Sequence, residues 1–426
     1  MNALEELSRR GVVNAVSDPA LGEVFARERV SFYCGYDPSF SSLQLGNLFA
    51  IVTMRRLQEL GHRPVILVGG GTGCIGDPSG RGSERNLLDR ERVEENARAI
   101  RRQLEGLIDF GGGAGAAVLV DNRDWLAGFN LLDFLREVGS RFRVGEMLAR
   151  DSVKRRLESE DGLSFTEFSY QVLQAYDFLH LYRMLGVRLQ IGGGDQWGNI
   201  TAGIDLIRRE ESAQAFGLVI PLVTDSQGRK FGKSTAGEAI YLDAGISSPY
   251  RMYQFLLNAE DVRVVDYLKY YTFLPLEEIA VLEAETRARP ERREAQRRLA
   301  GEVVKFVHGA DGLARAEKAT AIFFGAAIEN LSYPDLRSIF SGAPRVELAR
   351  DRLAAGINVV ELLAATPLWK GKNDVRRSIE QRGAYLNNLP VETAGLIVDS
   401  SRLVAGGALV VRKGKKNYAL ILAADF

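Results

Sequence analysis

The stretch "VSFYCGYDPSFSSLQLGNL", residues 30–48, joins a strand-like run to the start of a helix-like run. Residues 30–37 are a strand candidate, and residues 46–60 carry side chains at helical spacing. The helix is expected to end at Gly61, a good C-terminal cap. Between the two runs lies a turn rich in small and polar residues. The stretch therefore predicts a strand–turn–helix unit, in which the helix start favours phosphate.

The same alternation continues along the first half of the chain. Further strands are expected at 64–73, 116–122, 187–193 and 217–224, and further helices at about 165–185 and after "GDQWGN" (194–199). Apolar strands that alternate with helices predict a doubly wound, Rossmann-like parallel sheet in an α/β domain. Ligands of such sheets bind beyond the C-terminal ends of the strands.

The composition narrows the class of protein. The 426 residues are 46% hydrophobic and 26% charged, which is typical of a soluble globular protein of roughly three domains. A formal net charge of zero excludes a generally basic nucleic-acid coat. Two cysteines, Cys34 and Cys74, exclude a disulfide framework and a cysteine-based zinc cluster. No apolar run reaches the length of a membrane span, so a cytoplasmic protein without a membrane partner is expected.

The second half of the chain changes in character. Residues 1–243 are assigned to the Rossmann-like domain, 244–328 to an all-helical domain, 329–352 to a linker and 353–426 to a small α+β domain. From Lys370 to Phe426 there are ten Lys and Arg against five Asp and Glu, so this tail carries +5 and the rest −5. The tail is therefore expected to bind a polyanion.

Residues whose side chains could bind a ligand or take part in catalysis follow the predicted strands. Tyr33, Gly35 and Asp37 alternate and share one face of the first strand, where Gly35 allows a ligand close to the backbone. Asp77 follows the glycine-rich "GGGTGCIGDPSG" (69–80) and is placed to receive a cation. Asp195 follows three glycines after a later strand.

Two further segments carry candidates. Tyr170, Gln174 and Asp177 lie on one face of the predicted 165–185 helix. The loop "GRKFGKS" (228–234) presents lysines that suit phosphates. Each candidate also has an ordinary alternative: Tyr33 as a core aromatic, Asp177 as a solvated carboxylate, Cys34 as a small buried residue and the 228–234 loop as a solvated hairpin. Their recurrence at successive strand ends favours a single cleft.

Long strings in the chain resemble bacterial tyrosyl-tRNA synthetases, which are class I aminoacyl-tRNA synthetases. The matching strings include "HRPVILVGGGTGCIGDPSG" (62–80), "SFTEFSYQVLQAYDFLHLY" (164–182), "LQIGGGDQWGNITAGIDLIRR" (189–209) and "IPLVTDSQGRKFGKS" (220–234). The tail resembles the S4-type RNA-binding domain of these enzymes. The resemblance implies a tyrosine–tRNA ligase that forms tyrosyl-adenylate from L-tyrosine and ATP and then charges tRNA(Tyr).

The resemblance also implies a tyrosine site. Tyr33 and Asp177 would hold the phenol. Asp77, Tyr170 and Gln174 would bind the ammonium group, and Gln196 would lie near the carboxylate. The residues implied for ATP are Cys34, Gly35, Asp37, Gly46, Asn47, Gly193, Asp195, Lys230, Lys233 and Ser234.

Catalysis is implied to rest on positioning and on charge stabilisation of the leaving pyrophosphate, with Mg²⁺ bound through ATP. The two signature motifs of the class, HIGH and KMSKS, correspond here to Gln44-Leu45-Gly46-Asn47 and to residues 230–234. The residues implied to act on the phosphates are Ser39, Gln44, Asn47, Arg81, Arg85, Lys230 and Lys233.

Gln44 and Asn47 replace the two histidines of the HIGH motif. An amide supplies both a hydrogen-bond donor and an acceptor, as a neutral histidine does, but it cannot become cationic. The turn is therefore expected to bind ATP and support catalysis, with modestly altered transition-state stabilisation.

For RNA, the resemblance implies a homodimer whose tRNA spans both subunits. Arg208 and Arg209 would contact the acceptor stem or be an ordinary solvated helix end. The tail residues expected to form a basic face are Lys372, Arg376, Arg377, Arg412, Lys413, Lys415 and Lys416.

Three rival hypotheses compete with a tyrosine–tRNA ligase. Two are enzymes: a tryptophanyl-tRNA synthetase, and another adenylyl-transferring enzyme with a HIGH-type turn. The third is an RNA-binding protein that kept the fold and lost catalysis, for which Gln44 is the best support.

Overall fold

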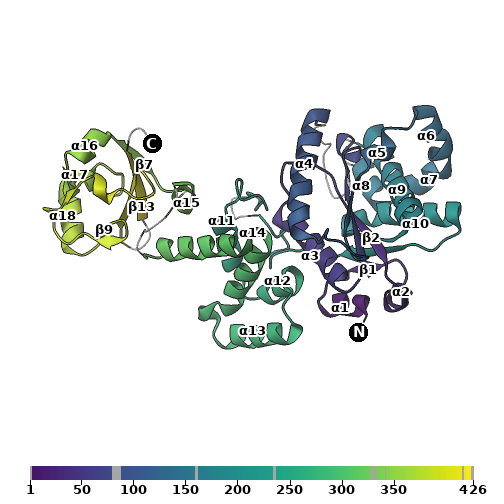
Figure 1. Cartoon of the computed structure of the whole chain (residues 1–426), viewed down its shortest axis with the longest axis horizontal. Coiled ribbons are helices and arrows are strands. Elements are labelled where there is room, and N and C mark those ends of the chain that lie inside the picture. Colours follow the sequence, from purple (N-terminus) through teal and green to yellow (C-terminus); the bar gives the residue numbers. More distant parts are fainter. Residues whose placement is uncertain are drawn as a thin grey trace. The chain divides into compact units, whose positions relative to one another are not determined.

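The computed structural model describes residues 2–78, 88–158, 162–233, 237–326, 328, 331, 333–340, 342–414 and 417–423 (Figure 1). The chain divides into two compact units. Unit 1 comprises Met1–Ile246 and Leu257–Val307, and unit 2 comprises Ser247–Leu256 and His308–Phe426.

Unit 1 is built around a six-stranded sheet with the strand order β1-β6-β5-β2-β3-β4. Strands β2 to β6 run parallel to their neighbours, and β1 pairs antiparallel with β6 at the edge. The predicted doubly wound parallel sheet is confirmed. The sequence did not reveal β1, because two residues are too few to show a strand pattern. The strands are β1 (Ala15–Val16), β2 (Ser31–Tyr36), β3 (Arg63–Val68), β4 (Val118–Asp121), β5 (Val187–Gly193) and β6 (Phe216–Ile220).

The strand order reverses beside β2. The chain runs outward from β2 to β3 and β4, then returns to place β5 on the other side of β2. Such a reversal leaves a crevice beyond the C-terminal ends of the two strands that flank it. The crevice between β2 and β5 is therefore where the fold itself favours a ligand.

Helices surround this sheet. The predicted helices at 46–60 and 165–185 are observed as α3 and α9, and α9 packs closely on α10. A Cβ placed on Gly203 of α10 would lie 2.8 Å from Phe178 Cδ1 of α9, so that glycine permits the close approach. The helices before and beside the sheet are α1 (Ala3–Arg9), α2 (Leu21–Arg27), α3 (Leu45–Glu59), α4 (Arg90–Leu107), α5 (Arg123–Leu126), α6 (Leu131–Glu137), α7 (Val144–Leu148), α8 (Asp151–Leu157), α9 (Phe165–Leu185) and α10 (Trp197–Glu211).

The segment after the sheet is helical, as predicted. It contains α11 (Pro249–Leu257), α12 (Val264–Tyr271), α13 (Leu276–Ala288) and α14 (Glu294–Phe323). α14 is interrupted at Gly309, whose φ of 74° and ψ of 179° lie in a region that is essentially restricted to glycine. The interruption falls next to the boundary between the two units.

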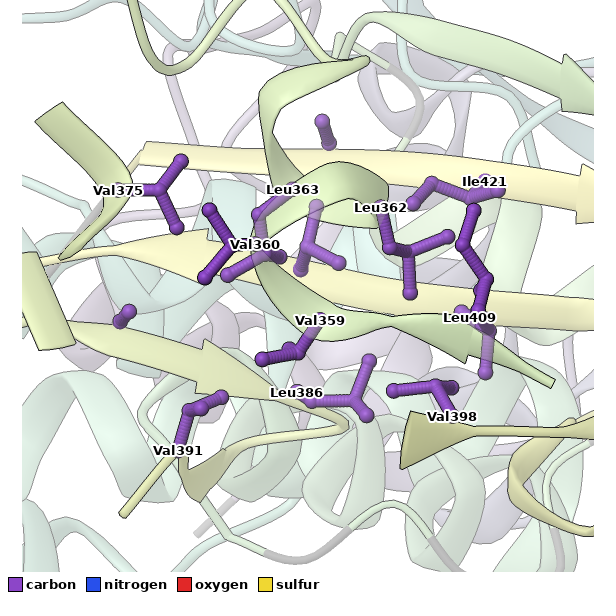
Figure 2. Close-up of a cluster of buried hydrophobic side chains, with 14 of the residues drawn as sticks. Val359, Val360, Leu362, Leu363, Val375, Leu386, Val391, Val398, Leu409 and Ile421 are labelled. Carbon is purple, nitrogen blue, oxygen red and sulfur yellow. The ribbon is translucent and has the colours of Figure 1, made fainter. Parts of the chain in front are cut away.

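Unit 2 contains a five-stranded sheet in the order β10-β9-β12-β13-β7. Both faces of its central strands are buried. Leu409, Val411 and Ile421 face a cluster that includes Val359 and Leu363 (Figure 2). The alternate residues of the same strands face a second cluster formed with α14 and α15. The elements are α15 (Tyr333–Ile339), β7 (Arg345–Leu348), α16 (Arg350–Ala354), β8 (Ile357–Asn358), α17 (Val359–Ala364), α18 (Lys372–Glu380), β9 (Ala384–Leu386), β10 (Leu389–Pro390), β11 (Ile397–Val398), β12 (Ala408–Lys413) and β13 (Asn417–Ala423).

The segment 329–352, expected as a linker, contains secondary structure. α15 and β7 lie within it, and β7 pairs in parallel with β13. The many turn residues there separate short elements that join a sheet built mainly from later residues.

Candidate active site

The C-terminal ends of four neighbouring strands bring polar side chains together. Asp37 follows β2, Thr72 follows β3, Asn122 follows β4 and Asp195 follows β5. Because β2 to β5 are parallel, these ends lie at one edge of the sheet. The candidate site is therefore at the crevice that the strand order creates.

Asp177 of α9 is buried in this site and held by two donors. Its Oδ2 accepts from Asn122 Nδ2 at 2.9 Å, and its Oδ1 accepts from Trp125 Nε1 at 2.8 Å. Burial raises the pKa of Asp177 to about 8, against the lowering effect of those two hydrogen bonds. The carboxylate keeps lone pairs that can accept one more hydrogen bond.

Tyr33 of β2 lies within electrostatic reach of Asp177. Its side chain is 1% exposed, and its ring packs against Phe178 at 5.2 Å between centroids. Burial, together with the charge of Asp177, raises the pKa of the Tyr33 hydroxyl. That hydroxyl has no hydrogen-bond partner among the residues that the structure describes. Buried hydroxyls are normally paired, so this one suits a ligand that brings its own polar group.

Asp37 links the strand ends to α9. Its Oδ1 accepts from Thr72 Oγ1 at 2.7 Å, and its Oδ2 accepts from Tyr170 OH at 2.8 Å. Asn122 in turn donates to Thr72 Oγ1 at 2.9 Å and to Asp177. A continuous chain of hydrogen bonds thus connects Asp37 with Asp177.

The glycines after β3 make room for the acidic side chains. A Cβ on Gly69 would lie 2.1 Å from Asp37 Oδ1, and one on Gly70 would lie 2.3 Å from Asp121 Oδ1. The backbone N–H groups of this run are used within the protein: that of Gly70 donates to Asp121 at 3.1 Å and that of Gly71 to Asn122 at 2.8 Å. The glycine run fixes side chains of the site.

A second network of amides lies where α9 meets the start of α10. Gln174 Nε2 donates to Gln196 Oε1 at 3.0 Å, and Gln196 Nε2 donates to Asp77 Oδ2 at 2.7 Å. Asn199 Nδ2 donates to Gln174 Oε1 at 2.8 Å. We call Asp77, Gln174, Gln196 and Asn199 the amide relay. It orients one carboxylate among neutral side chains, which suits a ligand with a single positive charge.

The turn before α3 meets the lysine-bearing loop. Leu45 N–H donates to Ile240 O, and Ile240 N–H donates to Gly232 O, each at 2.8 Å. A Cβ on Gly232, whose φ is 99°, would lie 3.2 Å from the backbone nitrogen of Gly46. The loop with Lys230 and Lys233 therefore lies against the N-terminal end of α3, where anions are favoured.

Asn47 is oriented by its own helix start. Its Oδ1 accepts from the backbone N–H of Gln44 at 2.9 Å. The oxygen is thereby occupied, so the NH₂ group is the part of the amide that can serve a ligand. Gln44 is half-buried and Asn47 is exposed at this end of α3.

The remaining nucleotide candidates lie at the ends of β2 and β5. Gly35 is exposed between buried neighbours in β2, and Gly193 is the last residue of β5. Burial and nearby Asp77 raise the pKa of Asp195, while Lys230 opposes the rise. Cys34 is buried, and burial raises the pKa of its thiol to about 11. Ser39 is exposed, and Arg81, Arg85 and Ser234 lie outside the described residues.

The arginines predicted to contact the acceptor stem are exposed and paired within the chain. Arg208 Nη2 donates to Asp205 Oδ1 at 3.0 Å. Arg209 donates to Arg141 O at 3.0 Å and to Glu146 Oε2 at 3.2 Å. These pairings are compatible both with an ordinary solvated helix end and with a contact to RNA.

Apart from Arg412, the tail candidates fall into three groups. Lys372, Arg376 and Arg377 are exposed on α18. Lys413 donates to Asp374 Oδ2 at 2.9 Å, and this bond helps to lower the pKa of Asp374 to about 2. Lys415 and Lys416 lie outside the described residues.

Arg412 differs from the expectation of an exposed basic face. Its side chain is 8% exposed, and its guanidinium carbon lies 3.6 Å from the centroid of the Tyr385 ring. Arg412 shares a face of β12 with Val410, and that face is covered by the second cluster of unit 2. The sequence could not show that both faces of the strand are buried.

Sequence inspection missed Thr72, Asn122, Trp125 and Asn199. Asn122 directly follows the predicted strand "AAVLVDN" (116–122), so the rule applied to the other strand ends would have found it. Trp125 and Asn199 carry no such signal, because only the fold brings them to Asp177 and Gln174.

Among the described residues, no group of three or more His, Cys, Asp or Glu side chains is arranged to hold a metal ion. Within the same residues, no helix has the length and apolar character needed to span a membrane.

Known proteins match both parts of the chain. Residues 26–325 match the family described as "tRNA synthetases class I (W and Y)", and residues 335–421 match the "Tyrosine--tRNA ligase SYY-like C-terminal domain". The tyrosine–tRNA ligase of Roseiflexus castenholzii is 48% identical over 419 residues, which is 98% of each chain. That of Bacillus caldotenax is 46% identical over 423 residues, or 99% of each chain.

A solved structure agrees with these matches. The C-terminally truncated mitochondrial tyrosyl-tRNA synthetase of Aspergillus nidulans superimposes with a TM-score of 0.69 at 31% identity. The superposition covers 75% of this chain and 93% of that one.

Proposed function

Because this chain belongs to the tyrosine–tRNA ligases of class I, we propose that the crevice between β2 and β5 binds tyrosine and ATP through the residues described above. The protein is a tyrosine–tRNA ligase, and tyrosine, ATP and tRNA are its partners. The full-length matches favour this activity over a tryptophanyl enzyme, another adenylyl-transferring enzyme or a non-catalytic relative.

The buried Asp177 is the observation that carries the tyrosine assignment. Its carboxylate would accept the phenol O–H, and the Tyr33 hydroxyl would donate to the phenol oxygen. Both groups are buried, and Asp177 is oriented by Asn122 and Trp125. Phenylalanine would leave the Tyr33 hydroxyl unpaired and Asp177 without its third donor, and a buried polar group that lacks a partner is costly.

The ammonium and carboxylate of tyrosine would lie at the amide relay. Asp77 supplies the single negative charge for the ammonium, with Gln174 and Tyr170 as neutral acceptors. Gln196, which donates to Asp77, would turn toward the substrate carboxylate. The relay would thus hold the nucleophilic carboxylate at a fixed distance from ATP.

ATP would lie between the start of α3 and the lysine-bearing loop. Asp195 would accept from the ribose, with Asn47, Cys34 and Gly35 beside it, and Gly46 and Gly193 would allow close approach. The tyrosine carboxylate attacks the α-phosphorus, and pyrophosphate leaves. Lys230, Lys233 and the N-terminal end of α3 would stabilise its charge, helped by Gln44 and Ser39, and by Arg81, Arg85 and Ser234.

Magnesium would enter with ATP. Mg²⁺ retains water and binds phosphate oxygens readily, so the ATP phosphates would be its main ligands. The ion would share the charge of the phosphates, while the lysines orient them.

The RNA-binding role is proposed for residues 353–426, after a helical domain at 244–328 and the segment 329–352; residues 1–243 would form the catalytic domain. Lys372, Arg376 and Arg377 form the exposed set on α18. Lys413, Lys415 and Lys416 would add to it, whereas the buried Arg412 would support the strand.

A homodimer is proposed, and four large apolar side chains that are exposed are the observation that favours it. Leu131, Leu132, Val144 and Phe165 are between 60% and 77% exposed on α6, α7 and the start of α9. Exposed apolar groups of this kind mark interaction sites. Arg208 and Arg209 on one subunit would then meet a tRNA that also reaches the partner. A cytoplasmic location is proposed from the role of these enzymes in translation.

The activity is tested by tyrosine-dependent ATP–pyrophosphate exchange followed by charging of tRNA(Tyr). Exchange with tyrosine and none with tryptophan or phenylalanine would support the assignment. Binding of tRNA without exchange would overturn it in favour of a non-catalytic protein.

Gln44→His should leave the rate of tyrosine activation similar or raise it modestly, by less than about tenfold. Histidine restores a group that can become cationic near the leaving phosphates, whereas glutamine contributes only a neutral dipole. Single-turnover formation of tyrosyl-adenylate measures the effect. Gln381→His, at an exposed glutamine of the C-terminal segment, is the control. A large loss of rate in Gln44→His would show that the amide makes a necessary contact of its own.

A further inference from the structure

We infer that Arg150 is a positioning residue for the tyrosine ammonium site, acting through α9 and α10. Arg150 lies between α7 and α8 in the sequence and follows none of the strands directly. The inference rests on the proposed assignment of the amide relay to the ammonium group, and it adds a residue that does not touch the substrate.

The Arg150 side chain contacts the first turn of α10. Nη1 donates to Gly198 O and, at 2.8 Å, to Thr201 Oγ1. These two acceptors flank Asn199, whose Nδ2 donates to Gln174. Arg150 therefore fixes the turn that supplies one member of the relay.

The same guanidinium also contacts α9. With its amide oxygen toward Arg150, Gln171 accepts from Nε at 2.5 Å and from Nη1 at 3.2 Å. Gln171 is buried and lies between Tyr170 and Gln174 in the sequence. One planar cation thus joins both helices that present the ammonium-binding side chains. A fork of fixed geometry suits this task better than a flexible ammonium group.

The surroundings of Arg150 keep it in this place. The side chain is half-buried, and burial lowers its pKa while the carboxylates of Asp205 and Glu146 oppose that change. An arginine remains cationic under these conditions. Arg143 lines the same small pocket but is exposed, which makes it a matched control.

The test compares two ligands of the full-length protein. Arg150→Ala should weaken L-tyrosine binding about tenfold or more, because small displacements of positioned groups are costly. It should weaken the binding of 4-methylphenol, which lacks both the ammonium and the carboxylate that the relay would hold, by less than about threefold. Arg150→Lys should restore part of the tyrosine affinity, and Arg143→Ala should bind both ligands normally. Calorimetry measures both dissociation constants.

If Arg150→Ala weakens the binding of both ligands equally, or of neither, the positioning role is overturned. If Arg150→Ala does not fold, Thr201→Val carries the test, because it removes one acceptor at nearly constant volume. A selective loss of tyrosine affinity in Thr201→Val, smaller than that expected for Arg150→Ala, supports the inference, and its absence contradicts it.

Gln174→Ala, measured alongside, separates this inference from the assignment on which it rests. If Gln174→Ala shows no selective loss of tyrosine affinity, the ammonium site itself is misplaced and the role of Arg150 falls with it. If Gln174→Ala shows the loss and Arg150→Ala does not, only the role of Arg150 is rejected.

Discussion

Asp177→Asn is expected to raise the dissociation constant for tyrosine by about 100-fold and to leave that for ATP within about twofold. The carboxylate accepts from Asn122 and Trp125 and still has a lone pair for the phenol O–H. An amide has one acceptor oxygen, so the variant cannot satisfy all three donors. Equilibrium binding of each substrate measures the two effects.

Asp124→Asn is the matched control for this variant. Asp124 is an exposed carboxylate next to Trp125 in the sequence, so its loss should leave both affinities unchanged. Equal losses for tyrosine and ATP in Asp177→Asn would refute the placement of Asp177 at the phenol.

The same carboxyl group gives tyrosine binding a pH dependence. With a pKa of about 8 in the free protein, Asp177 becomes ionised as pH rises through that value. The ionised form accepts a hydrogen bond from the phenol O–H. Tyrosine affinity should therefore improve from about pH 6.5 to 8.5 in the native protein and not in Asp177→Asn. Since the folded-state pKa exceeds 3.8, the stability linked to this group is present at low pH and lost as pH rises through about 8.

Lys233→Ala is expected to lower the rate of tyrosyl-adenylate formation by roughly 100- to 1,000-fold, with tyrosine affinity unchanged. The lysine loop lies against the N-terminal end of α3, where charge on the leaving pyrophosphate would develop. An ammonium group lost from this position removes a contact that is strongest in the transition state. Single-turnover kinetics at saturating ATP measures the change.

Arg229→Ala separates this effect from a general loss of positive charge. Arg229 is exposed on the same loop and pairs with Asp225 at 2.7 Å, so its removal should change the rate little. Similar losses in both variants would mean that the loop contributes its overall field and not a specific contact.

Sequence patterns sufficed for the fold of unit 1 because its strands are long apolar runs. The helix expected at 165–185 is α9 to the residue, and the strand expected at 187–193 is β5. Patterns failed where an element is too short, as for β1, or where both faces are covered, as for Arg412 on β12.

The candidate site residues also divide into those that the sequence predicts and those that it does not. Asp37 and Asp195 could be predicted because each lies within two residues of the C-terminal end of a strand. Trp125 and Arg150 could not, because their roles depend on which helices meet after folding. The hydrogen bonds of Arg150 span 48 and 51 residues of sequence, a distance at which no local pattern operates.

Unit 2 is assembled from two separate stretches of the chain, and this limits how the protein can be dissected. Tyr250 of α11 packs on the cluster that contains Phe340 and Tyr418, and Gln254 donates to Thr320 at 2.8 Å. A fragment that begins at His308 would lack both groups and expose that cluster to water. No single cut therefore yields an intact unit 2: a stable fragment would need α11 supplied as a peptide or joined by permuting the chain.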